Sequence, residues 1–132
     1  MNVHVEFPLL QRLALPIVVG TAKFPGIKIH DTRMIRLMEG LLHGGATAGG
    51  WTAKQIHDAL LTAFQLAAAR YGLNQLRYDL RQMKAHGLIE RDAKRYAHRL
   101  TGKGTKVALT FVLFHQRLCG PLANSLPEES PA

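Results

Sequence analysis

Residues 76–91 have the sequence LRYDLRQMKAHGLIER. Within this stretch Leu76, Leu80 and Met83 recur at intervals of three and four residues, the spacing that gives a helix one apolar face. Gly87 is the residue type that most readily adopts the left-handed conformation at the end of a helix. The four residues that follow, LIER, lack the helical spacing and are typical of a strand. The stretch therefore predicts a helix that runs directly into a β-strand.

The sequence after this strand predicts a hairpin and a final helix. Residues 92–95 have the composition of a turn, and residues 96–100 are expected to form the returning strand. Thr101 is a favourable N-cap for a last helix over residues 103–118. The helix before Gly87 is expected to begin at Leu73. A helix, a two-stranded hairpin and a second helix therefore follow one another.

Two more helices are expected upstream. Asp31 or Thr32 is a suitable cap for the first of them. Thr52 is expected to cap the second, with Gln55 as its partner in a capping box. The Ala-rich sequence that follows suggests that this helix continues to Arg70. The predicted fold is mainly α with one small β-hairpin.

The chain is expected to contain a single domain with extensions at both ends. Residues 1–30 contain a short β-branched run, turn residues and a second alternating segment, which predict an N-terminal extended arm or hairpin. Residues 31–120 are expected to form the domain, and residues 121–132 have the composition of a flexible tail. A chain of 132 residues is long enough for one ordinary hydrophobic core.

The positive charge of the chain is concentrated in one region. Residues 70–106 contain ten Lys or Arg and three Asp or Glu, a surplus of seven in a chain whose net charge is +8. A local concentration of basic residues is typical of proteins that bind a phosphate backbone. Charge alone does not distinguish DNA from RNA or from an anionic membrane surface.

Two motifs in this basic region resemble those of a known class of proteins. Residues 84–91 match the pattern Lys-x-x-Gly-Leu-Ile-x-Arg, and residues 96–104 match Tyr-x-x-x-Leu-Thr-x-x-Gly. Both resemble the recognition helix and wing of bacterial winged helix-turn-helix regulators of the MarR-like and PadR-like kinds. The resemblance covers residues 31–119 and implies duplex DNA binding in transcriptional regulation. The long interval over residues 59–72 and the arm of residues 1–30 depart from that pattern.

A second resemblance involves three short segments. Residues 25–27 read Pro-Gly-Ile, residues 31–33 read Asp-Thr-Arg and residues 78–81 read Tyr-Asp-Leu-Arg. These segments are similar to ones found together in a group of bacterial proteins often encoded near mobile elements. This resemblance implies no particular function.

The polar face of the 73–86 helix and the hairpin are the predicted DNA-binding surface. A major groove about 12 Å wide admits one α-helix, whose outward side chains then reach the base edges. Asn and Gln suit adenine, Arg suits guanine, and Lys or Tyr reaches phosphates. Lys and Arg at a hairpin tip suit phosphates or the minor groove. The predicted DNA-binding residues are Asn74, Gln75, Arg77, Tyr78, Arg81, Gln82, Lys84, Lys94, Arg95 and Arg99.

Other interpretations remain for parts of this surface. The basic face could instead meet an acidic protein partner or RNA, with the winged helix acting as an interaction module. A regulator that responds to a small molecule is a third possibility, although no pocket signature is evident. Asp79, the only acidic residue assigned to the outer face, could pair with Arg77 or Lys84 on the same helix.

The sequence predicts no catalysis, cofactor or metal. The seven His residues and Cys119 lack the spacing of a metal site, although His115 and Cys119 lie one helical turn apart. No glycine-rich phosphate loop and no combination of nucleophile and base is present. The absence of a long apolar run or a leader pattern, together with a single Cys, predicts a cytoplasmic protein without a membrane segment.

The last predicted helix favours self-association. Its apolar residues are spread over more than one face, so most of its surface must be covered. A homodimer formed through this C-terminal helix is expected. The alternative is that residues 1–30, which include Leu9 and Leu10, fold back over it within one chain.

Overall fold

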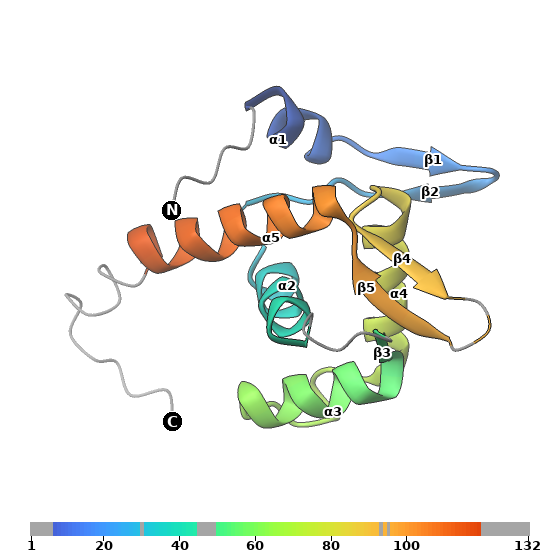
Figure 1. Cartoon of the computed structure of the whole chain (residues 1–132), viewed down its shortest axis with the longest axis vertical. Helices are drawn as coiled ribbons and strands as arrows, with labels where there is room; N and C mark the ends of the chain where they lie inside the picture. Colours follow the sequence, from blue (N-terminus) through green and yellow to red (C-terminus); the bar gives the residue numbers. More distant parts are fainter. Residues whose placement is uncertain (1–6, 30, 45–49, 93, 95, 120–132) are drawn as a thin grey trace.

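The computed structural model describes residues 7–29, 31–44, 50–92, 94 and 96–119. The described part is mainly helical, with two small antiparallel sheets, which confirms the predicted balance of structure (Figure 1). The elements are α1 (Phe7–Leu13), β1 (Ile17–Val19), β2 (Ala22–Phe24), α2 (Thr32–Gly44), β3 (Trp51–Thr52), α3 (Ala53–Ala63), α4 (Leu73–Ala85), β4 (Ile89–Asp92), β5 (Ala97–Leu100), α5 (Gly102–Phe114) and a π-helical turn (His115–Cys119).

The helices α2, α3 and α5 start where the sequence predicts them because suitable side-chain caps are present. Thr52 and Gln55 form the expected capping box, with bonds of 3.2 Å and 3.0 Å between their side chains and each other's backbone N–H. The Thr101 hydroxyl accepts a bond of 3.0 Å from the backbone N–H of Gly104. Asp31 accepts from the N–H of Met34 at 3.3 Å. These bonds satisfy N–H groups that have no partner within the first turn of a helix.

The prediction that the helix from Thr52 continues to Arg70 is wrong. The helix α3 ends at Ala63, and Gln65 adopts a left-handed conformation with φ of 52°. The N–H of Gln65 then bonds to the carbonyl of Thr62, and the N–H of Leu66 bonds to that of Leu61, as in a Schellman motif. Glycine normally occupies this position, so the sequence contains no obvious stop signal.

The predicted stop at Gly87 is confirmed. Gly87 has φ of 77°, and its N–H bonds to the carbonyl of Lys84 while the N–H of Leu88 bonds to that of Met83. This Schellman motif turns the chain out of α4 and into β4. Leu88 and Met83 are both fully buried, so the turn is also held by apolar packing.

The predicted hairpin is part of a sheet of three strands. Strands β4 and β5 pair antiparallel, with Ile89 opposite Leu100 and Arg91 opposite His98. Strand β3, which was not predicted, pairs with the other edge of β5 and gives the order β3-β5-β4. It has only two residues, too few to show a strand pattern in the sequence.

The core lies between α2, α5 and the inner faces of α3 and α4. Figure 1 shows α5 running across α2, with α3 on the opposite side of α2 and the strands β4 and β5 to the right, beside the start of α5. The predicted apolar stripe of α4 is buried, since Leu76, Leu80 and Met83 expose 2% or less of their surface. On α5, Val107 and Phe111 face α2 and are buried in the same core cluster.

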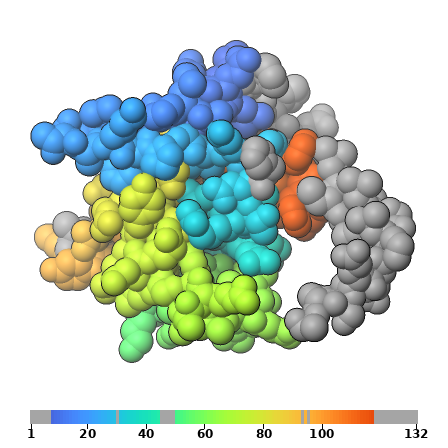
Figure 2. Space-filling model, turned by 180° about the vertical axis from the view of Figure 1, so that it is seen from behind, coloured from blue at the N-terminus to red at the C-terminus, as the bar shows by residue number. Residues whose placement is uncertain are grey.

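The N-terminal segment packs on this domain. A hairpin is present as β1 and β2, but its second strand lies at Ala22–Phe24, within the predicted turn, and not in the alternating segment of residues 27–29. The helix α1 before it was not expected. Leu13 and Ile27 belong to the main core cluster, and the N–H of Ile27 bonds to the carbonyl of Leu13 at 2.8 Å. Figure 2 shows this segment, in blue, lying over α2 and α4. The segment therefore holds one side of α4 in place.

Candidate nucleic-acid interface

The outer face of α4 carries most of the predicted polar residues. Asn74, Gln75, Arg77, Arg81 and Lys84 are all exposed. Because the opposite stripe of the helix is buried in the core, Asn74 and the three cations point away from the domain. The prediction that Gln75 belongs to the same face is wrong, because its amide donates to the buried carboxylate of Asp79 at 3.0 Å. The outer face therefore comprises one amide and three cations.

Tyr78 is half-buried and links α4 to the N-terminal hairpin. Its ring centroid lies 6.1 Å from that of Phe24, and the two rings are tilted by 42°. The guanidinium carbon of Arg81 lies 5.9 Å from the centroid of the Tyr78 ring, within range of a cation–π contact. Tyr78 therefore supports Arg81 as well as forming part of the predicted surface.

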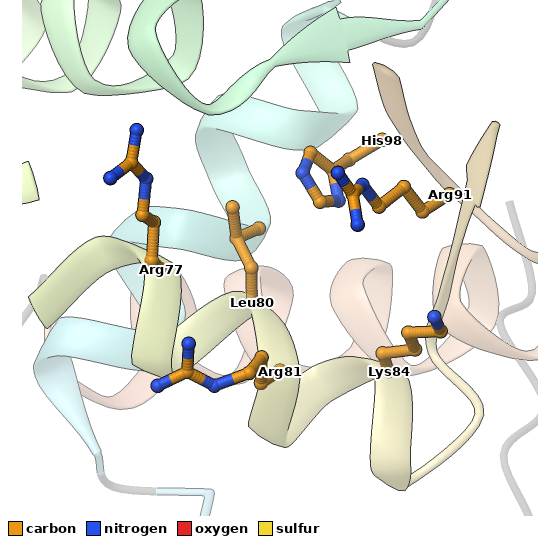
Figure 3. Close-up of a pocket in the computed structure, with 6 residues that line it drawn as sticks. All are labelled: Arg77, Leu80, Arg81, Lys84, Arg91 and His98. Atoms are coloured by element: carbon orange, nitrogen blue, oxygen red, sulfur yellow. The ribbon is translucent and has the colours of Figure 1, made fainter. Parts of the chain in front are cut away.

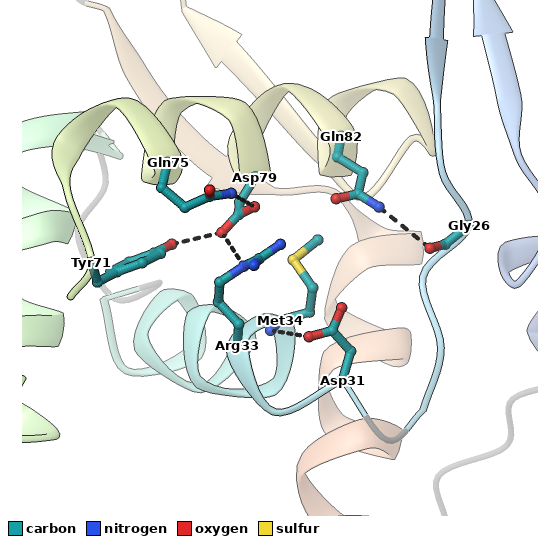
Figure 4. Close-up of polar contacts among 8 residues, drawn as sticks. All are labelled: Gly26, Asp31, Arg33, Met34, Tyr71, Gln75, Asp79 and Gln82. Carbon is teal, nitrogen blue, oxygen red and sulfur yellow. Dashed lines mark hydrogen bonds and ion pairs between the residues drawn. The ribbon is translucent and has the colours of Figure 1, made fainter.

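The prediction that Gln82 points outward is wrong. Its side chain is 3% exposed, and its amide N–H donates to the carbonyl of Pro25 at 2.9 Å. It also donates to the carbonyl of Gly26 at 3.3 Å (Figure 4). His86, the residue directly after α4, contacts the same Pro25 carbonyl through Nε2 at 2.9 Å. Gln82 thus anchors the N-terminal segment and does not reach the outer face.

Asp79 also lies on the inner side of α4, where its carboxylate accepts three contacts (Figure 4). Arg33 Nε lies 2.9 Å from Oδ2, the Tyr71 hydroxyl donates to the same oxygen at 2.9 Å, and Gln75 donates to Oδ1 at 3.0 Å. The side chain of Asp79 is fully buried. The predicted partners Arg77 and Lys84 are therefore wrong. Burial, and then the charge of Asp79, raise the pKa of Tyr71 far above its usual value, so the hydroxyl keeps its proton.

A basic cleft separates α4 from the hairpin (Figure 3). Its volume is about 280 Å³, and its polar lining comes from three cations of α4, one cation of β4 and an imidazole of β5. Leu80 forms the apolar part of the wall. No carboxylate lines the cleft in the part of the chain that the structure describes. The polar residues that line it are Arg77, Arg81, Lys84, Arg91 and His98.

His98 is held neutral in this cleft. Burial lowers the pKa of its imidazole below the usual 6.5, and the positive charges of Arg91 and Lys84 lower it further. Its Nδ1 atom is buried and has no hydrogen-bond partner within the described residues. The charge of the cleft at neutral pH is therefore that of its Arg and Lys side chains.

Three further hairpin residues, Arg99, Lys94 and Arg95, were predicted to contact DNA. Arg99 lies opposite Glu90, on the face away from Arg91 and His98, and its Nε atom forms an ion pair of 2.6 Å with Glu90. Lys94 is exposed at the hairpin turn, where its N–H bonds to Asp92 at 2.9 Å. Arg95, also predicted to contact DNA, lies outside the described residues. The structure thus separates Arg99 from the cleft.

Sequence reasoning missed Arg91 and His98 as members of this surface. The register of β4 and β5 places them opposite each other, on the face that turns toward α4. Alternation along the two predicted strands could have indicated that Arg91 and Arg99 point in opposite directions. The pairing register was needed to show which of the two arginines faces α4.

Comparison of the chain with models of protein families, with curated proteins and with solved structures found no match. Among the described residues, no three His, Cys, Asp or Glu side chains are grouped so that they could hold a metal ion. None of the described helices has both the length and the apolar character needed to cross a membrane. The candidate site is therefore interpreted from its own geometry and charge.

Proposed function

We propose that this chain binds duplex DNA as a winged helix-turn-helix protein and acts in transcriptional regulation. In this proposal α4 enters the major groove and the β4–β5 hairpin is the wing. The order of α2, α3, α4, the hairpin and α5 supports it, since helix, helix, helix, hairpin and helix is the winged-helix order. Helix α4 has 13 residues and is about 20 Å long at 1.5 Å per residue, enough to present two or three turns to a groove.

The observation that carries the proposal is the combination of the outer face of α4 with the basic cleft. Arg77, Arg81, Lys84 and Arg91 converge there, and none of them forms an ion pair with a described residue. Four cations held together without an acidic partner repel one another, and a chain of phosphates relieves that repulsion. The exposed amide of Asn74 adds a side chain suited to reading adenine.

Arg91 lines the cleft and Arg99 lies on the opposite face of the same hairpin, so we expect them to contribute differently to DNA binding. If Arg91 meets a phosphate, Arg91→Ala should lower the slope of log K against log salt concentration by about 0.9. Arg99→Ala is the matched control, because Arg99 is paired with Glu90 on the opposite face and should leave the slope unchanged. Titrations of a labelled duplex at four or more salt concentrations measure both slopes. Equal slopes for the two variants would remove Arg91 from the DNA-binding surface.

A second copy of the chain is the proposed partner for the outer side of α5. Val107 and Phe111 are buried within one chain, but Leu113 is only half-buried and Phe114 remains 37% exposed. Apolar residues of this kind at the end of a helix favour contact with another copy. A twofold dimer would place two α4 helices on half-sites about 34–36 Å apart.

Light scattering at micromolar concentration measures the mass of this assembly. The expected mass is twice that of one chain, and Phe114→Asp should shift it toward the single chain because a carboxylate cannot be buried there without cost. Arg117→Asp, which changes an exposed polar residue nearby, is the control and should leave the mass unchanged. A wild-type chain that stays monomeric would contradict the dimer but not the DNA-binding surface.

A further inference from the structure

The N-terminal hairpin, formed by β1 and β2, is fixed along one side of α4. Tyr78, Gln82 and His86 follow one another at intervals of four residues, so they lie in one row along the helix and its C-cap. Tyr78 packs against Phe24, and the other two side chains contact the carbonyl of Pro25. The cations of the basic cleft lie on another side of α4, toward β4 and β5. The outer face of α4 therefore has a hairpin on each side.

The two hairpins extend beyond α4 on the same side of the molecule. Figure 1 shows β1 and β2 at the top and β4 and β5 below them, and Figure 2 shows the same arrangement from behind, in blue and orange. A major groove about 12 Å wide is bounded by two sugar–phosphate backbones, and a helix about 10–12 Å across fills it. Elements attached to both sides of a helix in the groove therefore face the two backbones.

The N-terminal hairpin and the residues before it expose a group of apolar side chains. Leu15, Val18 and Val19 are 60%, 62% and 51% exposed. Thr21, at the turn between the strands, and Lys23 are exposed as well. Large apolar side chains that are grouped on a surface mark a contact with another molecule. The free end of this hairpin is therefore a candidate interaction surface.

The charge of this segment favours DNA over a second copy of the chain as its partner. Residues 7–29 contain no Asp or Glu, and Lys23 is the one charged residue of the hairpin itself, residues 17–24. A second copy would bring its own Lys23 to the contact and no carboxylate to pair with it. A DNA backbone offers phosphates to Lys23 and to the hydroxyl of Thr21, and the C–H surface of its sugars can cover the valines.

We propose that the tip of the N-terminal hairpin contacts the sugar–phosphate backbone of the duplex, on the side of the major groove opposite the β4–β5 hairpin. This contact rests on the proposed function, because it requires α4 to lie in the groove. Lys23 binds a phosphate in this arrangement. Val19 shares one face of the hairpin with Phe24, which packs on α4, so Val19 extends that face toward the backbone.

Titrations of a labelled duplex at four or more salt concentrations test the charged contact. Lys23→Met should lower the slope of log K against log salt concentration by about 0.9, the value for one lost phosphate contact. Lys28→Met is the matched control, because Lys28 is also an exposed lysine but follows the hairpin, where the chain runs toward α2 (Figure 1). Its slope should equal that of the wild type. Thermal unfolding of both variants confirms that they are folded.

A pair of variants at the tip tests the position of Val19. Val19→Asp places a carboxylate beside the phosphates and should weaken the binding of every duplex at least about fivefold, the effect of two like charges in contact in water. Val19→Asn introduces a side chain of nearly the same shape without the charge, so it should weaken binding far less. The difference between the two variants therefore measures how close the tip lies to the backbone.

An unchanged salt slope for Lys23→Met, or equal affinities for Val19→Asp and Val19→Asn, would overturn this contact. If Arg91→Ala still lowers the slope in the same titrations, only the contact of the N-terminal hairpin fails, and duplex DNA binding stands. A wild-type chain that binds no duplex would overturn both. Light scattering without DNA gives the last outcome, since a lower mass for Val19→Asp would show that a second copy covers the tip in place of DNA.

Discussion

Replacing Gly104 by alanine should destabilise the fold by about 3 kcal/mol, at the upper end of what overpacking usually costs. A β-carbon at this position would lie 1.7 Å from the carbonyl oxygen of Leu88 and 2.6 Å from its carbonyl carbon. Both atoms belong to the backbone, which is held there by the bond of 2.9 Å between the N–H of Thr101 and the same oxygen. The first turn of α5 would therefore have to move away from the Gly87 turn.

Gly102→Ala is the matched control for this change. Gly102 lies in the same helical turn, but a β-carbon there would have no heavy atom within 4 Å. Its stability should change by less than about 1 kcal/mol, the difference between glycine and alanine in a helix. Urea unfolding of the two variants compares them directly. Equal stabilities would show that α5 does not rest on Leu88 as the structure places it.

Removal of Arg33 should cost about 3 kcal/mol, because breaking a buried ion pair on one side leaves the other charge without compensation. Asp79 is fully buried, and without Arg33 it would keep only the hydrogen bonds from Tyr71 and Gln75. The expected loss lies at the lower end of the range for buried pairs because the side chain of Arg33 is 46% exposed. Arg33→Leu, followed by urea unfolding, measures it.

A second change separates the charge from the packing of Arg33. Asp79→Asn in the Arg33→Leu background removes the unpaired charge and keeps the shape, so it should recover more than half of the lost stability. Arg36→Leu, one turn along α2 and over the Phe64 ring, should cost less than about 1 kcal/mol. If Arg33→Leu and Arg36→Leu were equally stable, or if the second change recovered nothing, Asp79 would not depend on Arg33.

The parts of the fold that follow local rules could be predicted from the sequence. Side-chain caps at Thr52 and Thr101, and a glycine at residue 87, define helix ends through bonds to nearby backbone groups. The end of α3 could not be predicted because Gln65 occupies a left-handed position that usually takes glycine. Strand β3 and helix α1 are short and depend on their packing, so their sequences carry no clear period.

Only part of the candidate site could be predicted from the sequence, because some of its residues are placed by tertiary contacts. The apolar stripe of α4 correctly identified the exposed Arg77, Arg81 and Lys84 on the opposite face. It did not identify Asp79 and Gln82, which are polar and buried because they bond to partners distant in sequence. A polar residue beside an apolar stripe is assigned to solvent unless its partner is known. Only the tertiary structure supplies Arg33, Tyr71 and the Pro25 carbonyl.

Competition binding on a duplex selected from a random pool tests the proposed function most directly. A labelled duplex that carries the selected site is titrated at physiological salt, with unlabelled random duplex as competitor. Wild-type protein should bind the selected site at least about a thousandfold more tightly than random duplex.

Arg81→Ala should lose about 1–3 kcal/mol of binding free energy on the selected site and far less on random duplex. Arg12→Ala, far from α4 in sequence, should behave as wild type. An equal affinity for selected and random duplex, or an Arg81→Ala loss that is the same on both, would contradict reading of DNA by α4.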